Sequence, residues 1–149
     1  MVGRLERCSW RVTPGLRKAY FQTAYVVRAP LGVHALRIGV HHPAFDAEVA
    51  SAAALCWAVV TAWNPASLLR SAEENSLAQA DLLGTVSELK LTGWAAEGKA
   101  DGGGWREESV CVLDLDVAGA VALGRRFGQL AVVVGQLGSA AQLVAVAAA

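Results

Sequence analysis

Hydrophobic and polar residues alternate along the chain with two different periods, and these periods predict a series of short strands and helices. A threonine-proline pair near the N-terminus is typical of a helix start and predicts a short helix to about Tyr20. From residue 21 to 28 every second residue is aromatic or β-branched, which predicts a strand, and residues 34–40 are expected to return as its hairpin partner. Pro43 opens another short helix, expected to reach about Ala53.

From Cys56 onward, the pattern predicts the order strand, helix, strand, strand, helix, strand. The first helix of this series begins where Ser71 and Glu74 have the spacing of a capping box. The second is expected between Asp116, a capping residue, and Gly128. The first strand is expected over residues 56–63, and the first helix is expected to end at Gly93. The next two strands are expected over residues 94–97 and 109–115, with an exposed glycine-rich tip at 99–105 between them. The last two strands are expected over residues 130–134 and 142–146.

This order is the split βαβ plan of a ferredoxin-like sandwich (βαββαβ), an α+β fold in which helices cover one face of an antiparallel sheet. We expect such a unit from about residue 56, preceded by the N-terminal β-hairpin and short helices. The hairpin is expected to extend the sheet or to cover its open face. A chain of 149 residues favours one domain, which we place at residues 19–146, after a flexible basic arm over residues 1–18.

The composition narrows the class of protein. Hydrophobic residues make up 54% of the chain, which excludes an intrinsically disordered protein, and a formal net charge of zero counts against duplex binding. The cysteines, Cys8, Cys56 and Cys111, form neither a disulfide framework nor a C-x-x-C motif, so a reducing cytoplasm is expected. Two uncharged stretches, 49–69 and 127–149, contain turn signals, which favour buried strands over membrane spans.

Four groups of residues stand out in combination. They are Thr61-Ala62-Trp63-Asn64-Pro65, Ser71 with Glu74-Asn75, Trp105 with Glu107-Glu108-Ser109, and Leu123-Gly124-Arg125-Arg126-Phe127-Gly128-Gln129. Together they resemble the bacterial "domain of unknown function 3293" family over roughly residues 19–135, with a departure at Leu130, where the family has asparagine. The resemblance implies a small cytosolic bacterial protein and supplies no reaction, substrate or cofactor.

The Trp63-Asn64-Pro65 corner is the best candidate site, because it ends a buried strand and leads through Arg70 into a capped helix N-terminus. The proline predicts an extended backbone at Asn64. The helix N–H groups, the amide and the indole can hold an anionic or amide-bearing ligand. In a structural alternative, Asn64 closes an Asx-turn, Glu74 completes its capping box, and Trp63 is core. The candidate ligand-binding residues are Trp63, Asn64, Arg70, Ser71, Glu74, Asn75, Trp105, Glu108 and Gln129.

Other chemistry has weaker support in the sequence. Adjacent carboxylates at 73–74 and 107–108 point to different sides of their elements, which argues against an acid/base pair. The three histidines lack the spacing of metal ligands, and no metal or other cofactor is expected. Residues 109–115 lack the aromatic RNA-binding signature, so neither nucleic acid nor a membrane is expected as a partner.

Three functions remain open. The first is a non-catalytic binding or regulatory module that uses residues 63–75 for a small polar ligand or a partner peptide. The second is a small enzyme of unknown reaction, with Glu74 or Glu108 as acid/base beside Asn64. The third is an interaction protein whose exposed edge strand pairs with a second copy to form a homodimer.

Overall fold

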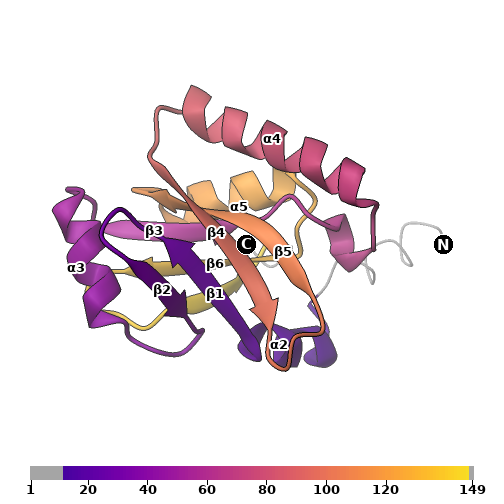
Figure 1. Cartoon of the computed structure of the whole chain (residues 1–149), viewed down its shortest axis with the longest axis horizontal. Coiled ribbons are helices and arrows are strands. Elements are labelled where there is room, and N and C mark those ends of the chain that lie inside the picture. Colours follow the sequence, from indigo (N-terminus) through magenta and orange to yellow (C-terminus); the bar gives the residue numbers. More distant parts are fainter. Residues whose placement is uncertain (1–11, 148–149) are drawn as a thin grey trace.

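The computed structural model describes residues 12–147, which form a seven-stranded antiparallel sheet with helices on both faces (Figure 1). The α+β class predicted from the sequence is confirmed. The helices are α2 (Pro14–Phe21), α3 (Pro43–Ser51), α4 (Ala72–Glu88) and α5 (Val117–Arg126), with a 3-10 turn η1 (Pro65–Ser67). The strands are β1 (Thr23–Arg28), β2 (Val33–Leu36), β3 (Cys56–Val60), β4 (Gly93–Ala100), β5 (Arg106–Leu113), β6 (Ala131–Gln136) and β7 (Gln142–Ala145), in the sheet order β2-β1-β4-β5-β3-β6-β7.

Helices α4 and α5 cover the same face of the sheet, toward the top of Figure 1. Leu82 and Val86 of α4 and Leu123 of α5 are buried in one core with valines of β3, β5 and β6. Asp116 caps α5, as predicted, by accepting a hydrogen bond from the Gly119 backbone N at 2.8 Å. The spacing of the apolar residues and the cap together determine where α5 begins and which face it buries.

The other face of the sheet is concave, and α3 closes one end of it. Phe45 of α3 is only 1% exposed. Its ring packs edge-on against Trp57 of β3, with the ring centroids 5.3 Å apart, and against Trp94 of β4 at 6.1 Å. This aromatic cluster fills the α3 end of the concave face.

The N-terminal hairpin extends the sheet, which is one of the two arrangements expected for it. β1 pairs with β4, and β2 forms one edge while β7 forms the other. The two edges meet where Gly39 N donates to Ala141 O at 2.7 Å and Ala141 N donates to Val40 O at 3.0 Å. The sheet is therefore curled so strongly that segments next to its two edge strands are hydrogen-bonded to each other. Pairing of an edge strand with a second copy stays a prediction.

Several elements differ from their expected boundaries because long-range pairing outweighs the local sequence pattern. α4 ends at Glu88, since Lys90 adopts a left-handed conformation with φ of 57°, and Gly93 begins β4 instead of closing the helix. β4 and β5 are longer than expected and leave residues 101–105 as the tip between them. Small and polar residues in β4 carry little strand signal, but this strand is paired on both sides.

Helix α2 begins as predicted, with Thr13 accepting a hydrogen bond from the Leu16 backbone N at 3.2 Å. Residues 14–18 of the expected basic arm are therefore helical, whereas residues 1–11 of that arm lie outside the described part of the chain. Between residues 12 and 147, no helix combines the length and the apolar character that crossing a bilayer requires.

Candidate functional site

A cavity of about 550 Å³ lies on the concave face of the sheet, at the end away from α3. Apolar side chains of the central strands, including Val59 and Val133, form its floor. Leu16 and Tyr20 of α2 contribute to its wall, and Leu69, which is 92% exposed, is part of its rim. Ligand sites commonly have volumes of about 300–1,000 Å³, so this cavity has room for a small organic molecule.

Strand β5 directs two polar side chains into this cavity. Cys111 belongs to the core of the concave face, so strand alternation places Ser109 and Glu107 on that face, and both line the cavity. Ser109 is 5% exposed, and its hydroxyl has no hydrogen-bond partner among residues 12–147. Buried hydroxyl groups are rarely left without a partner. Ser109 therefore offers a cavity-facing hydrogen-bonding group that the fold does not use.

Asn64 fixes the position of the Glu107 carboxylate. Its Nδ2 donates to Oε1 of Glu107 at 2.9 Å. Its Oδ1 accepts hydrogen bonds from the Arg70 backbone N and from Asn75 Nδ2, both at 3.0 Å. The backbone N of Asn64 donates in turn to Oδ1 of Asn75 at 3.0 Å, so the two asparagines form a reciprocal pair. The amide of Asn64 is thus bonded to groups distant in sequence and not to an Asx-turn of its own.

The backbone of Asn64 is left-handed, with φ 45° and ψ 61°, and the expectation of an extended conformation is wrong. Asparagine tolerates this region better than most residues, and the reciprocal bonds with Asn75 hold it there. Ala66 and Ser67 also have positive φ, at 57° and 61°. A positive φ in a residue other than glycine strains the backbone, and such strain persists only where the surrounding structure holds the backbone in place. At Asn64 the hydrogen bonds with Asn75 do this.

Two of the groups of residues that resemble the family meet at this corner. Gly128 has φ of 69°, and a Cβ added to it would lie 2.9 Å from Cβ of Pro65. The carbonyl of Gly128 accepts a hydrogen bond from Ala66 N at 2.8 Å, and Gln129 Nε2 donates to Trp63 O at 3.1 Å. Only glycine satisfies both the left-handed backbone and the close approach at position 128. The Trp-Asn-Pro corner and the Gly-Gln pair therefore form a single packed unit beside the cavity.

The cavity is aromatic and carries one carboxylate. Burial raises the pKa of Glu107, and the hydrogen bond from Asn64 opposes this rise with a smaller effect. Burial is also the main cause of the raised pKa values of Tyr20 and Tyr25. The indole Nε1 of Trp63 is buried without a hydrogen-bond partner among residues 12–147. Among the residues that line the cavity, Glu107 is the only one with a carboxylate.

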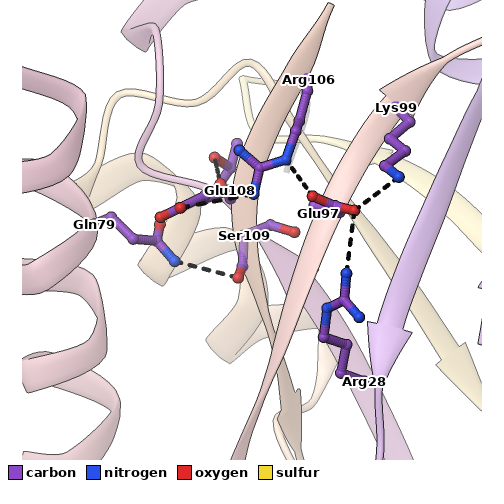
Figure 2. A network of polar contacts seen from close by, with 8 residues as sticks. Arg28, Gln79, Glu97, Lys99, Arg106, Glu108 and Ser109 are labelled. Atoms are coloured by element: carbon purple, nitrogen blue, oxygen red, sulfur yellow. Dashed lines mark hydrogen bonds and ion pairs between the residues drawn. The ribbon is translucent and has the colours of Figure 1, made fainter. Parts of the chain in front are cut away.

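Six of the nine candidate residues line the cavity. They are Trp63, Asn64, Arg70, Asn75, Trp105 and Gln129. The other three lie elsewhere. Ser71 Oγ accepts a hydrogen bond from Glu74 N at 3.1 Å and donates to Glu74 Oε1 at 3.0 Å, so this pair caps α4. Glu108 points to the other face of β5, where it lies 3.7 Å from Arg106 (Figure 2).

The cavity residues that were not candidates include Tyr20, Tyr25, Glu107 and Ser109. In the sequence, Glu107 stands out as a member of a family-like group and of an adjacent carboxylate pair, and neither pattern marks it as a ligand-binding residue. Strand alternation counted backward from the buried Cys111 would have placed Ser109 and Glu107 together on the concave side. The two tyrosines have no comparable signal, because their position depends on how the sheet curls.

The opposite face of the sheet carries a charge cluster centred on Glu97 of β4 (Figure 2). Glu97 is 5% exposed, and Arg28 and Lys99 approach it at 3.6 and 3.1 Å. Arg106 donates a hydrogen bond to it, and this bond is the main cause of the lowered pKa of Glu97. The guanidinium of Arg106 is therefore neutralised on this face.

Replacing Glu97 with glutamine is expected to lower the free energy of unfolding by about 1.5–3 kcal/mol at neutral pH, the usual range for hydrogen bonds to charged groups. Because the folded-state pKa of Glu97 is lowered, its stabilisation is present above the unfolded pKa of about 4.3 and is lost as pH falls through the folded value. Urea unfolding should show the gap between wild type and Glu97→Gln closing in acid. Glu108→Gln, a change of a more exposed carboxylate, should show little effect, and a gap for Glu97→Gln that is independent of pH would contradict the prediction.

The histidines are engaged in the fold. His34 contacts the buried Glu48, and His41 Nε2 lies 2.7 Å from Asp46 Oδ2. His42 Nε2 accepts a hydrogen bond from a backbone N–H at 3.1 Å. Within the described range of 12–147, no three His, Cys, Asp or Glu residues cluster in a way that could hold a metal ion.

In a comparison with known proteins, part of the chain matches a family model. The model of the family described as "Protein of unknown function (DUF3293)" matches residues 60–132. This segment is shorter than the 19–135 expected from the resemblance, and it contains the Asn64 corner, β5 and the Gly128-Gln129 pair. No curated protein and no solved structure matches the chain. The resemblance noted in the sequence is thus confirmed: residues 60–132 match the model of the DUF3293 family of proteins of unknown function.

Proposed function

We propose that this protein is a non-catalytic binding or regulatory module that takes up a small molecule in the cavity of its concave face. The observation that carries the proposal is a cavity of about 550 Å³ with apolar walls and polar groups that the fold leaves unused. Ser109 Oγ and Trp63 Nε1 are both buried without a partner among the described residues. An apolar pocket with a few convergent polar groups is the usual form of a small-molecule site.

The Trp63-Asn64-Pro65 corner supports binding in two ways. Trp63 contributes to the cavity wall. Asn64 holds the Glu107 carboxylate in place, because its own amide is fixed by Asn75 and by the Arg70 backbone N. A group that is already oriented loses less conformational freedom when a ligand binds. Asn64 thus acts as a positioning residue.

We also infer that β3, α4, β4, β5, α5 and β6 form a ferredoxin-like unit in a bacterial cytoplasmic protein. In support, these strands lie in the order β4-β5-β3-β6, as two interlocked βαβ units require, and α4 and α5 share one face. The free thiols of Cys56 and Cys111 are consistent with a reducing compartment.

A thermal-shift screen tests the binding proposal. Compounds small enough for the cavity are added to wild type, to Ala131→Leu, which places a larger side chain in the cavity, and to Glu108→Gln, whose change lies on the other face of β5. A ligand at about 100 times its Kd stabilises the folded state by about 2.7 kcal/mol. For a chain of this size, that corresponds to a rise in Tm of about 5–10 °C.

We expect compounds that stabilise wild type and Glu108→Gln but have no effect on Ala131→Leu. A compound that shifts all three proteins equally binds outside the cavity. Failure of every cavity-sized compound to shift wild type would count against a binding function.

An enzyme that uses Glu107 as acid or base is the second candidate. The observation in its favour is the raised pKa of this partly buried carboxyl beside Asn64. Glu74 and Glu108 are the carboxylates that the sequence suggested for this role. Glu74 instead takes part in the cap of α4, and Glu108 faces the opposite side of β5. Mass spectrometry of a cavity ligand after incubation separates the two functions. A binding module returns the ligand unchanged, whereas an enzyme converts it in wild type and not in Glu107→Gln.

A further inference from the structure

We infer that the molecule bound in the cavity carries a protonated amine or another cationic nitrogen, which forms an ion pair with Glu107. This inference rests on the proposed binding function and specifies the class of ligand. It is carried by the balance of charges at the cavity, by the free hydrogen-bonding capacity of Glu107, and by the aromatic groups around that carboxylate.

The unneutralised charge at the cavity is that of Glu107. Two arginines also contribute to the cavity lining, but both have carboxylate partners outside it. Arg70 lies 3.7 Å from Glu74, and Arg106 is bonded to Glu97 on the opposite face. No cation among residues 12–147 lies within ion-pair distance of Glu107, whose one hydrogen bond there comes from the neutral amide of Asn64. A positively charged ligand would therefore supply the counter-charge for Glu107 that residues 12–147 do not provide.

The second carboxylate oxygen of Glu107 is available to such a ligand. Asn64 Nδ2 engages Oε1 at 2.9 Å and leaves Oε2 without a hydrogen bond from residues 12–147. Because burial disfavours the ionised form of this carboxyl, its negative charge is poorly compensated in the free protein. An ammonium group at Oε2 would form a charge-assisted hydrogen bond and relieve that penalty.

An anionic ligand is disfavoured for two reasons. It would place a second negative charge beside Glu107 in a cavity of low polarity, where like charges repel more strongly than in water. The N-terminus of α4, the element that could favour an anion, already carries the side chains of Ser71 and Glu74.

The remaining cavity groups fit an aromatic or aliphatic amine. Tyr20, Trp63 and Trp105 supply ring surfaces, which attract cations and pack against hydrocarbon. Trp105 lies against Gly98, where an added Cβ would be 3.6 Å from its ring, so the ring borders the strand pair that carries Glu107. Ser109 lies two residues farther along the same face of β5, roughly 7 Å from Glu107, and can bond a second polar atom of the ligand.

Matched compounds that differ only in their polar end test the inference. Tryptamine, tryptophol and indole-3-acetate are compared, together with the corresponding phenylethyl amine, alcohol and acid, by thermal shift and calorimetry at neutral pH. We expect the amines to bind wild type and the alcohols and acids to bind at least about tenfold more weakly. In Glu107→Gln, which keeps an oxygen for Asn64, amine affinity should fall about thirtyfold or more, whereas Glu108→Gln should bind like wild type.

The outcomes separate the inference from the proposed function. If alcohols or acids bind wild type as tightly as the amines, or if Glu107→Gln keeps full amine affinity, the cationic ligand is excluded while binding in the cavity stands. If none of the three classes binds wild type, the cationic ligand is excluded, and the proposed function is then decided by the wider thermal-shift screen of cavity-sized compounds. The melting temperature of ligand-free Glu107→Gln, expected at or above that of wild type, shows that a loss of binding is not a loss of folding.

Discussion

Leu123→Asp is expected to abolish cooperative folding. Leu123 is 5% exposed on α5 and belongs to the core between that helix and the sheet. Losing a buried leucine costs about 2–5 kcal/mol, and burying an unpaired carboxylate in its place costs several kcal/mol more. A domain has a total stability of about 5–15 kcal/mol, so this one change removes most or all of it. A thermal melt followed by circular dichroism should show no cooperative transition.

Ala122→Asp is the matched control, because it introduces the same side chain one residue away on the exposed side of α5. Its stability should fall by no more than about 1 kcal/mol, close to the loss of helix propensity when aspartate replaces alanine. A cooperative, near-native melt for Leu123→Asp would mean that α5 does not pack through the face that contains Leu123.

Helix α5 illustrates what could be predicted from sequence. This helix is capped by Asp116, buries one face and ends before Gly128. Each of these features depends on residues that are close to one another in the sequence. The expected elements from β3 to β7 are present in the expected order for the same reason. Local signals of this kind determine which elements exist but leave their exact ends to the partners with which they pair.

The Asn64 corner illustrates what could not be predicted. Local sequence suggested an extended backbone and an Asx-turn, whereas Asn64 is left-handed and its side chain bonds Asn75 and Glu107, 11 and 43 residues away. The choice between Glu107 and Glu108 likewise depends on strand register, since a shift of one residue moves a side chain to the opposite face. Register here follows from the pairing of β5 with β3 and β4.

The cavity itself depends on the curl of the sheet, which no single segment encodes. Its walls come from α2, from the central strands and from β7. The curl is closed by backbone hydrogen bonds that join Gly39 and Val40 to Ala141, a pairing about 100 residues apart that no local sequence pattern indicates. The six candidate residues at the cavity were found because the Asn64 corner lines it, whereas Tyr20 and Tyr25 were missed because only the closed curl brings them there.

Phe45→Ala is expected to be the second most damaging change, because Phe45 fills the α3 end of the same curl. The ring is 1% exposed and contacts Trp57, Trp94 and the His34 ring, the last with centroids 5.3 Å apart. Truncating a buried phenylalanine costs about 3–5 kcal/mol, through lost transfer energy and the hole left behind. For a chain of this size, Tm should fall by roughly 6–20 °C, measured by calorimetry.

Phe21→Ala makes the same chemical change at a ring that is 39% exposed and lies under the Arg17 guanidinium at 4.8 Å. Its cost should stay within about 1 kcal/mol, the strength of an exposed cation–π contact. Phe45 does not line the cavity, so a ligand held by Glu107 should bind folded Phe45→Ala with the affinity of wild type. Equal losses of stability in the two variants would mean that the aromatic cluster does not support the curl, and a loss of affinity in Phe45→Ala would mean that the two ends of the concave face are coupled.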